Sequence, residues 1–375
     1  MNKKLKVLPI LAMGLMLVAC NGGTSSSSKP TSKNDDVTFT LKVGSYVELV
    51  KNDPTNTNTI AVSSAAVILK DDTIVDAYFD VLQAPFTITD GKVSILTTGK
   101  HQTEQAGDKV IETKQELKDR YAMAKSDKTK EGEWYVQAGN FAKYTVGKTI
   151  SEVTSKNYKN AYNPDGTEIV SGCSISQTNF TTALKVITDT KTFKAPANTV
   201  SAGLGYKVNA LGTDNVLTVT IAGSATDKDG KIYETSINAY QIPLMVSSTD
   251  AAKIAYNPIN PQYNAPYAQL KAENFKDHTT ASADNKYYTE VLSKRELKEL
   301  YAMKDKATAG EWFTQANSFA IYAKGKVASE IANQSYKSNH NKDGKVEVAG
   351  CTITMEDFAV AIGKSATNKS GLKAK

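Results

Sequence analysis

Two stretches of the chain carry β-branched and aromatic residues on both sides of an Asp-rich turn. They read AAVILKDDTIVDAYFDVLQ at residues 65–83 and LTVTIAGSATDKDGKIYETSINAYQI at residues 217–242. Runs of this composition that flank a polar turn are typical of antiparallel hairpins. We therefore predict a β-hairpin in each stretch.

Helical periodicity follows each hairpin. Mostly apolar residues recur at positions i, i+4, i+7 and i+11, starting from Trp134 and again from Trp312. The two stripes are Trp134, Ala138, Phe141 and Thr145, and Trp312, Ala316, Phe319 and Ala323. Such stripes usually pack into a core, so we predict two buried helix faces. Gly147 and Gly325 are expected to end these helices.

A second helix is expected ahead of each stripe. Thr113 with Glu116, and Ser293 with Glu296, fit the capping box that starts a helix. The order in each part of the chain is then strands, helix, helix, turn, short strand and helix. This order predicts an α+β fold and not alternating βαβ units.

The chain also repeats itself. GEWYVQAGNFAKYTVGK at 132–148 matches GEWFTQANSFAIYAKGK at 310–326, and TKQELKDRYAM at 113–123 matches SKRELKELYAM at 293–303. The tryptophans lie 178 residues apart (134 and 312), and so do two of the three cysteines (173 and 351). We predict two tandem homologous domains, each an antiparallel sheet with packed helices. The expected boundaries are 37–190 for repeat 1, 191–198 for a linker, 199–365 for repeat 2 and 366–375 for a basic tail.

The first 20 residues predict export. Three lysines precede the apolar run LPILAMGLMLVA, which is too short for an ordinary membrane-spanning helix and ends just before Cys20. The boundary LVAC resembles the lipobox of bacterial lipoproteins, which implies that Cys20 is diacylated and anchors the protein on the outer face of the cell membrane. Two acyl chains are enough for stable anchoring. The alternative is an ordinary cleaved signal with an incidental cysteine. Residues 21–36 are polar and are expected to form a flexible tether.

Charge and histidine content narrow the possible functions. The formal net charge of +6 is spread along the 375 residues, and with the export signal this argues against a nucleic-acid binder. None of the three histidines, His101, His278 and His340, recurs in the other repeat. Zinc, haem and iron–sulfur ligation therefore lack support, and no nucleophile and base pair is evident. We expect no metal site.

A short motif closes each repeat: GCSIS at 172–176 and GCTIT at 350–354. The amphipathic segment after it predicts a final helix, with Ser176 and Thr354 as N-caps. Ser174 and Thr352 then lie in the loop that leads to a helix N-terminus. Such a position suits a phosphate, because free N–H groups and the helix dipole both attract anions.

The same motif has a purely structural interpretation. Gly172 and Gly350 would supply backbone freedom for a tight turn, and Cys173 and Cys351 would be small buried residues. A disulfide between these two cysteines is possible in an exported protein. We expect two shielded thiols instead, because a disulfide would lock the two loops face to face.

SGCSIS and AGCTIT resemble the flavinylation motif of the FMN-binding domain family, Ser/Thr-Gly-Ala-Thr-x-Ser/Thr. In that family the threonine receives FMN as a phosphoester from an FAD:protein FMN transferase. The repeated segments around the motif also resemble those of PplA-type lipoproteins, which have two flavin domains and serve extracellular electron transfer. The resemblance implies an FMN-binding-domain-like fold, with Thr352 and Ser174 as acceptors.

The chain departs from the family pattern at three places. Cysteine replaces alanine at 173 and 351, Ala349 replaces the usual hydroxyl residue, and serine replaces threonine at 174. We therefore expect Ser174 to be the slower acceptor. The resemblance also places the end of the first helix in each repeat beside the flavin. This adds Tyr121, Met123, Tyr301 and Met303 as candidate flavin contacts, which are otherwise read as core residues.

The resemblance implies an electron carrier and not an enzyme. It would relay electrons from a membrane quinone-linked reductase to free flavins or ferric iron outside the cell. A cofactor-free lipoprotein that binds a solute or a wall ligand between its two domains is the alternative. Release of a pheromone from the signal peptide is a third possibility, because the apolar segment ahead of Cys20 resembles pheromone precursors.

Overall fold

The structure is a computed structural model. It describes residues 36–51, 58–89, 92–95, 102–105, 108–124, 131–158, 161–163, 165–209, 216–243, 245–246, 254–255, 291–301, 303–304, 307–332 and 348–371. Cys20, the predicted signal, nearly all of the tether and the three histidines lie outside these residues. All elements below belong to one compact unit, Asp35–Lys375.

The first sheet has five antiparallel strands in the order β4-β3-β2-β1-β7. They are β1 (Asp36–Lys51), β2 (Asn58–Lys70), β3 (Thr73–Thr89), β4 (Lys92–Ile95) and β7 (Ile187–Pro196). Asp71 and Asp72, between β2 and β3, both have positive φ, 49° and 64°. Two such residues in a row make the type I′ turn that matches strand twist, so the first predicted hairpin is confirmed.

The second sheet has three antiparallel strands in the order β10-β9-β8. They are β8 (Ser201–Asn209), β9 (Val216–Thr226) and β10 (Ile232–Pro243). The β9–β10 turn is closed by a hydrogen bond from Gly230 N–H to the Asp227 carbonyl, 3.2 Å. The second predicted hairpin is therefore confirmed as well. Two short strand pairs complete the set: β5 (Gln102–Gln105) with β6 (Asp108–Ile111), and β11 (Met245–Val246) with β12 (Ile254–Ala255).

A similar series of helices follows each of the two hairpins along the chain. The first series is α1 (Lys114–Leu117), η1 (Lys118–Tyr121), α2 (Trp134–Thr145), α3 (Ile150–Thr154) and α4 (Thr178–Lys185). The second is α6 (Lys294–Leu297), η3 (Lys298–Tyr301), α7 (Trp312–Ala323), α8 (Ala328–Ala332) and α9 (Glu356–Thr367). Both capping boxes are present, at Thr113 with Glu116 and Ser293 with Glu296. Both predicted stripes are buried along α2 and α7.

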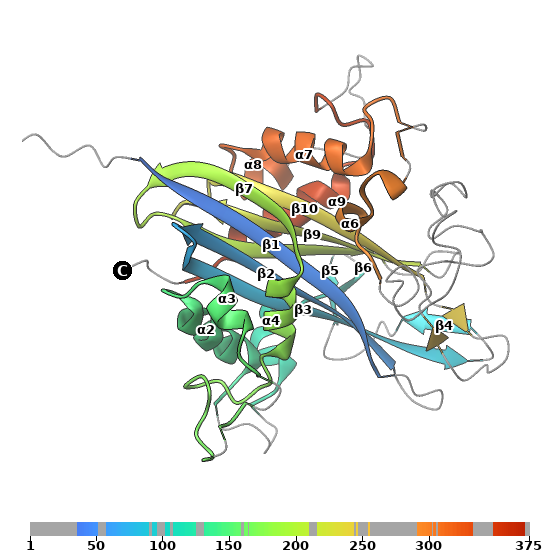
Figure 1. The fold of residues 1–375 in the computed structure, drawn as a ribbon. Helices are drawn as coiled ribbons and strands as arrows, with labels where there is room; N and C mark the ends of the chain where they lie inside the picture. Colours follow the sequence, from blue (N-terminus) through green and yellow to red (C-terminus); the bar gives the residue numbers. More distant parts are fainter. Residues whose placement is uncertain are drawn as a thin grey trace, which may run out of the picture. The chain divides into compact units, whose positions relative to one another are not determined.

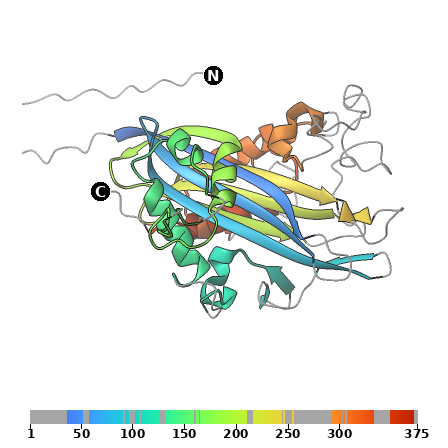
Figure 2. The same ribbon diagram turned by 60° about the horizontal axis from the view of Figure 1, so that its bottom comes forward.

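The sheets face each other and the helices cover their outer faces (Figure 1). Strand β3 shows the arrangement: Phe79 and Val81 pack under helices α2 and α4, whereas Leu82, Ala84 and Phe86 pack against the second sheet. Figure 2 shows the blue strands of the first sheet running beside the yellow strands of the second. Strands covered on both faces read as nearly continuous apolar runs, which explains the composition of β2 and β9. The fold is α+β with two antiparallel sheets, as predicted.

Matching segments make matching contacts in the two parts of the unit, which contain the first and the second series of helices. Gly147 N–H donates to the Ile74 carbonyl at 2.8 Å, and Gly325 N–H donates to the Ile232 carbonyl at 2.8 Å. Gly44 and Gly205 also play equal roles, because a Cβ there would lie 2.0 Å from the Ala183 carbonyl oxygen and 2.1 Å from that of Ala361. Only glycine lets α4 and α9 approach the strands this closely. The site loops ahead of these two helices are thereby fixed over their sheets.

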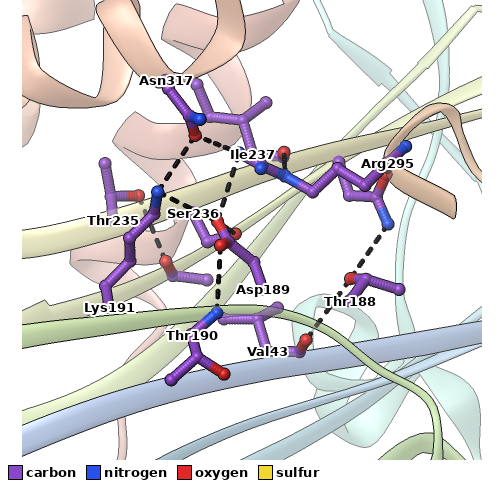
Figure 3. Close-up of polar contacts among 12 residues, drawn as sticks. Val43, Thr188, Asp189, Thr190, Lys191, Thr235, Ser236, Ile237, Arg295 and Asn317 are labelled. Carbon is purple, nitrogen blue, oxygen red and sulfur yellow. Dashed lines mark hydrogen bonds and ion pairs between the residues drawn. The ribbon is translucent and has the colours of Figure 1, made fainter. Parts of the chain in front are cut away.

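The stretch 191–198, expected to be a linker, is mostly strand. Its residues up to Pro196 belong to β7, which pairs with β1 and leads straight toward the second sheet. Asp189 on β7 accepts from Ser236 Oγ at 2.7 Å and pairs with Arg295 at 3.2 Å (Figure 3). Asn317 Oδ1 accepts from Arg295 at 2.8 Å and from Lys191 Nζ at 3.0 Å. The crossover strand β7 is therefore joined to α6, α7 and β10 by a polar cluster.

The segment expected as a basic tail, 366–375, is partly built into the fold. Its first two residues end α9. The next ones pair with β8, through hydrogen bonds from Leu204 N–H to the Asn368 carbonyl at 3.1 Å and from Ser370 N–H to the Ala202 carbonyl at 2.8 Å. Within the described part of the chain, no helix is long and apolar enough to cross a membrane.

Candidate functional site

The two Gly-Cys motifs adopt the same tight turn. Gly172 and Gly350 have φ of 72° and 77°, in the region that favours glycine. The next residue closes each turn: Cys173 N–H donates to the Val170 carbonyl and Cys351 N–H to the Val348 carbonyl, both at 3.0 Å. The structural role expected of the glycines is therefore present, whatever else the motif does.

Both cysteines are free and fully buried. They lie in different cores, Cys173 under the first set of helices and Cys351 under the second. Burial raises the pKa of each thiol to about 11. A thiol of that pKa is uncharged and unreactive at neutral pH, so the cysteines act as small apolar residues, as expected.

A glutamine that the sequence reasoning missed contacts each candidate acceptor. Gln315 Oε1 accepts from the Thr352 N–H at 2.8 Å and from its hydroxyl at 3.2 Å. Gln137 Oε1 makes the same contacts with Ser174, at 2.9 and 3.1 Å. Both amides are fully buried, and their nitrogens donate to the carbonyls of Gly310 and Gly132. The loop that carries each hydroxyl is thus tied to the first turn of α2 or α7.

A buried glutamate at the start of each helix fixes the neighbouring loop. Glu311 accepts from the backbone N–H of Met303 at 3.0 Å and of Lys304 at 3.3 Å. Glu133 does the same for Met123, at 2.8 Å, and for the next residue. These glutamates and glutamines occupy equal positions in the two copies of the GEW-x-x-Q segment. A polar residue repeated at a buried helix position was the signal that would have revealed them.

The prediction that Ser176 and Thr354 are N-caps is wrong by one residue. Helices α4 and α9 begin later, with Gln177 and Met355 at the cap position and no side-chain cap bond. At α4 the reason is local, since Gln177 turns its amide back onto the Cys173 carbonyl at 3.1 Å. Ser176 instead donates to the Tyr158 carbonyl at 3.2 Å.

The short strand expected ahead of the first motif is absent from the described residues there, and a single bridge between Tyr162 and Glu168 takes its place. The one expected ahead of the second motif lies mostly outside the described residues, of which Val348 forms a bridge with Cys351.

A cavity of about 630 Å³ brings several predicted residues of the second part together. Thr352, Thr354, Tyr301 and Met303 all line it. The remaining lining residues come from β9, β10, α6, α7, the motif loop and α9: Thr218, Thr220, Ala239, Gln241, Lys294, Trp312, Ile353, Asp357 and Phe358. Ligand pockets usually measure about 300 to 1,000 Å³, so the cavity is of suitable size for a cofactor.

One lysine lies in the wall of this cavity. The Lys294 ammonium lies 4.7 Å from the ring centroid of Tyr301 and 5.3 Å from that of Trp312. Burial lowers the pKa of Lys294 to about 7, and the charge of Asp357 opposes this shift. Burial also raises the pKa of Asp357, which accepts from Asn209 Nδ2 at 2.7 Å. The site therefore contains a cation that is easily discharged near neutral pH.

The first part contains the counterparts of these groups. The Lys114 ammonium lies 4.9 Å from the Tyr121 ring and 5.2 Å from the Trp134 ring. Here the acid and the amide are exchanged: Asn179 on α4 donates to Glu48 on β1 at 2.9 Å. Burial raises the pKa of Glu48, and the charge of Lys114 opposes the shift. A lysine, two rings and a hydrogen-bonded acid–amide pair thus recur in both parts.

These residues fit a flavin on three counts. Thr352 lies in the wall of a cavity of adequate volume and is half-buried, and two aromatic rings and a thioether line the same space. The bound group would be held by Thr352 through its phosphate and by Tyr301, Met303 and Trp312 around its ring. Among the described residues no group of three or more His, Cys, Asp or Glu side chains is placed to hold a metal ion.

Comparisons of the chain with protein-family models, with curated proteins and with solved structures find no match.

Proposed function

We propose that the protein is a surface lipoprotein that carries FMN esterified to Thr352 and, more slowly, to Ser174. It relays electrons from a membrane quinone-linked reductase to extracellular acceptors such as free flavins or ferric iron. The lipid on Cys20 holds it at the membrane. The two parts act as tandem homologous flavin domains, and the bound flavin supplies the one- and two-electron chemistry.

The observation that carries the proposal is the position of Thr352. This residue lies in the wall of the 630 Å³ cavity together with Tyr301 and Met303, which the sequence had also indicated as flavin contacts. The same hydroxyl–glutamine contact recurs at Ser174.

The attachment requires only an accessible hydroxyl from this chain. The transferase joins the FMN phosphorus of FAD to Oγ1 of Thr352, breaks the pyrophosphate bond and releases AMP, and the hydroxyl proton is lost. Gln315 positions the hydroxyl for this step, because its carbonyl oxygen accepts both the N–H and the O–H of Thr352. The partly buried loop keeps the group in one orientation.

Incubation of the purified mature protein with FAD and the transferase tests the proposal. Flavin fluorescence should remain on the denatured protein, fall by half or more in Thr352→Ala, and vanish in the Thr352→Ala/Ser174→Ala double variant. Fluorescence that persists in the double variant would disprove the assigned sites. A protein that stays colourless with every partner would favour the cofactor-free binding alternative.

A further inference from the structure

The cavity around Thr352 contains the ammonium of Lys294, which the attachment of FMN to Thr352 does not require. The Lys294 ammonium points over the rings of Tyr301 and Trp312, and in the described part of the chain it makes no ion pair and no hydrogen bond. Burying a cation in this way costs free energy unless an anion arrives to balance it. A charge kept at such a cost in a ligand cavity usually serves the ligand.

We propose that Lys294 is a positioning residue that faces the flavin ring and supplies positive charge to the ring when it is reduced. This inference rests on the proposed function of the cavity. The flat rings of Tyr301 and Trp312 and the thioether of Met303 line the space in which a flat aromatic group would lie. Lys294 lines that same space, and its ammonium lies 4.7 Å from the centroid of the Tyr301 ring.

Protons and electrons balance as follows. A donor of the reduced-quinone class delivers two electrons and two protons. One proton stays on the ring, which is left with one negative charge, and the second is held by the Lys294 amine as an ammonium. Below pH 7 the ammonium is already present in the oxidised protein, so reduction then takes up only one proton.

The groups that surround Lys294 either make other contacts or do not titrate near neutral pH. Asp357 on α9 is hydrogen-bonded to Asn209 and lies near Lys207 of β8. The Tyr301 hydroxyl on η3 donates to Gln241 of β10 at 3.0 Å. Glu311, at the start of α7, accepts from two backbone N–H groups. The lining residues from β9 and β10 are Thr218, Thr220, Ala239 and Gln241, none of which titrates near neutral pH.

The recurrence of the arrangement supports a shared role. Lys114 contacts Tyr121 and Trp134 in the first part just as Lys294 contacts Tyr301 and Trp312. The acid beside the lysine lies on a strand in one part and on a helix in the other, at Glu48 and Asp357. The pairing of lysine with a nearby acid is therefore kept although the positions of acid and amide are exchanged.

The test is a redox titration of protein that carries flavin only on Thr352, prepared as Ser174→Ala and checked by intact mass. We expect Lys294→Met to lower the equilibrium constant for reduction of the flavin at least tenfold at pH 6. This lowers the reduction potential by about 30 mV for a two-electron couple. Lys326→Met is the matched control, because Lys326 lies over the Tyr322 ring at 4.2 Å, outside the cavity. It should leave the potential unchanged.

A second variant keeps the test decisive if Lys294→Met does not fold or load. Lys294→Arg keeps its charge at all pH values, so its potential should match that of the parent at pH 6. Above pH 7 the potential of the parent should fall more steeply with pH than that of Lys294→Arg. The difference should be about 30 mV per pH unit, because reduction of the parent then takes up one further proton per two electrons. Equal slopes, or an unchanged potential in loaded Lys294→Met, would overturn this inference alone. A Ser174→Ala protein without flavin would overturn the proposed function and this inference with it.

Discussion

At the scale of single residues, the two parts of the molecule serve as controls for each other. Asp80 and Asn238 occupy equal positions on β3 and β10. Asp80 Oδ1 accepts from the N–H groups of Val81 and Gln115, and Asn238 Oδ1 accepts from those of Ala239 and Arg295. The Oδ1 contacts are the same, whereas the second side-chain atom is a carboxyl oxygen in Asp80 and an amide nitrogen in Asn238, which donates to Thr188 Oγ1 at 3.2 Å.

Asp80→Asn should therefore stabilise the protein at neutral and alkaline pH. Burial raises the pKa of Asp80 from its ordinary value of 3.8 to about 7. Between about pH 4 and pH 7 the folded state keeps a proton that the unfolded chain has lost. The carboxyl group then lowers stability by about 1.4 kcal/mol per pH unit as pH rises.

Urea unfolding of both proteins at several pH values checks this. We expect the variant to be more stable by about 2 to 4 kcal/mol at pH 8 and the difference to shrink as pH falls toward 4. A difference that is constant across this range would show that Asp80 is not a buried, protonated acid.

Gln315 gives a second prediction at this scale. Gln315→Leu keeps the volume but leaves the Thr352 N–H without its acceptor, so stability should fall by about 1 to 3 kcal/mol. Attachment of flavin to Thr352 should slow, because its hydroxyl is no longer oriented. Peptide mapping after incubation with FAD and the transferase measures both sites. Gln137→Leu should affect Ser174 and spare Thr352, and equal loss at both sites in either variant would contradict the account.

At the scale of elements, the local patterns predicted most of what forms. Paired charged and hydroxyl residues at Thr113 and Ser293 gave both capping boxes, and the aromatic stripes gave α2 and α7. The start of α4 and α9 was predicted one residue early. At α4, Gln177 uses its side chain on the Cys173 carbonyl, a contact that no propensity reveals. The role of Gln137 and Gln315 likewise depends on contacts across about forty residues of sequence.

The β2–β3 hairpin gives a prediction at the same scale. Asp71 and Asp72 both adopt positive φ, which costs free energy for residues other than glycine and asparagine. Asp71→Asn with Asp72→Gly creates the favoured Asn-Gly turn and should raise stability by about 0.5 to 1 kcal/mol. Thermal unfolding measures it. A fall in stability would show that the aspartates make contacts that the turn geometry does not require.

At the scale of the whole molecule, the face-to-face packing of the sheets could not be read from the sequence. The repeat predicted two similar parts joined by a linker, but nothing in it showed that Leu41 and Ile68 of one sheet share a core with Leu204 and Ile221 of the other. Apolar residues on both faces of a strand do not identify their partner. The crossover strand β7 and the Asp189–Arg295 pair became visible only with the fold.

The shared core predicts that the two parts unfold together. The chain has one tryptophan in each, Trp134 and Trp312, and both are buried. In Trp134→Phe the fluorescence reports the second part, and in Trp312→Phe it reports the first. Within each variant the fluorescence midpoint in urea should equal the far-ultraviolet circular dichroism midpoint, because neither sheet retains its core alone. Separate midpoints would show two independent folding units.

The central claim is that Thr352 and Ser174 carry FMN. Intact mass of the protein taken from its own cell surface tests it most directly, since each attached FMN adds one fixed increment beyond the lipid. The account predicts one or two such increments, with the first on the peptide that contains Thr352. A protein whose mass contains no flavin increment on either part would contradict it.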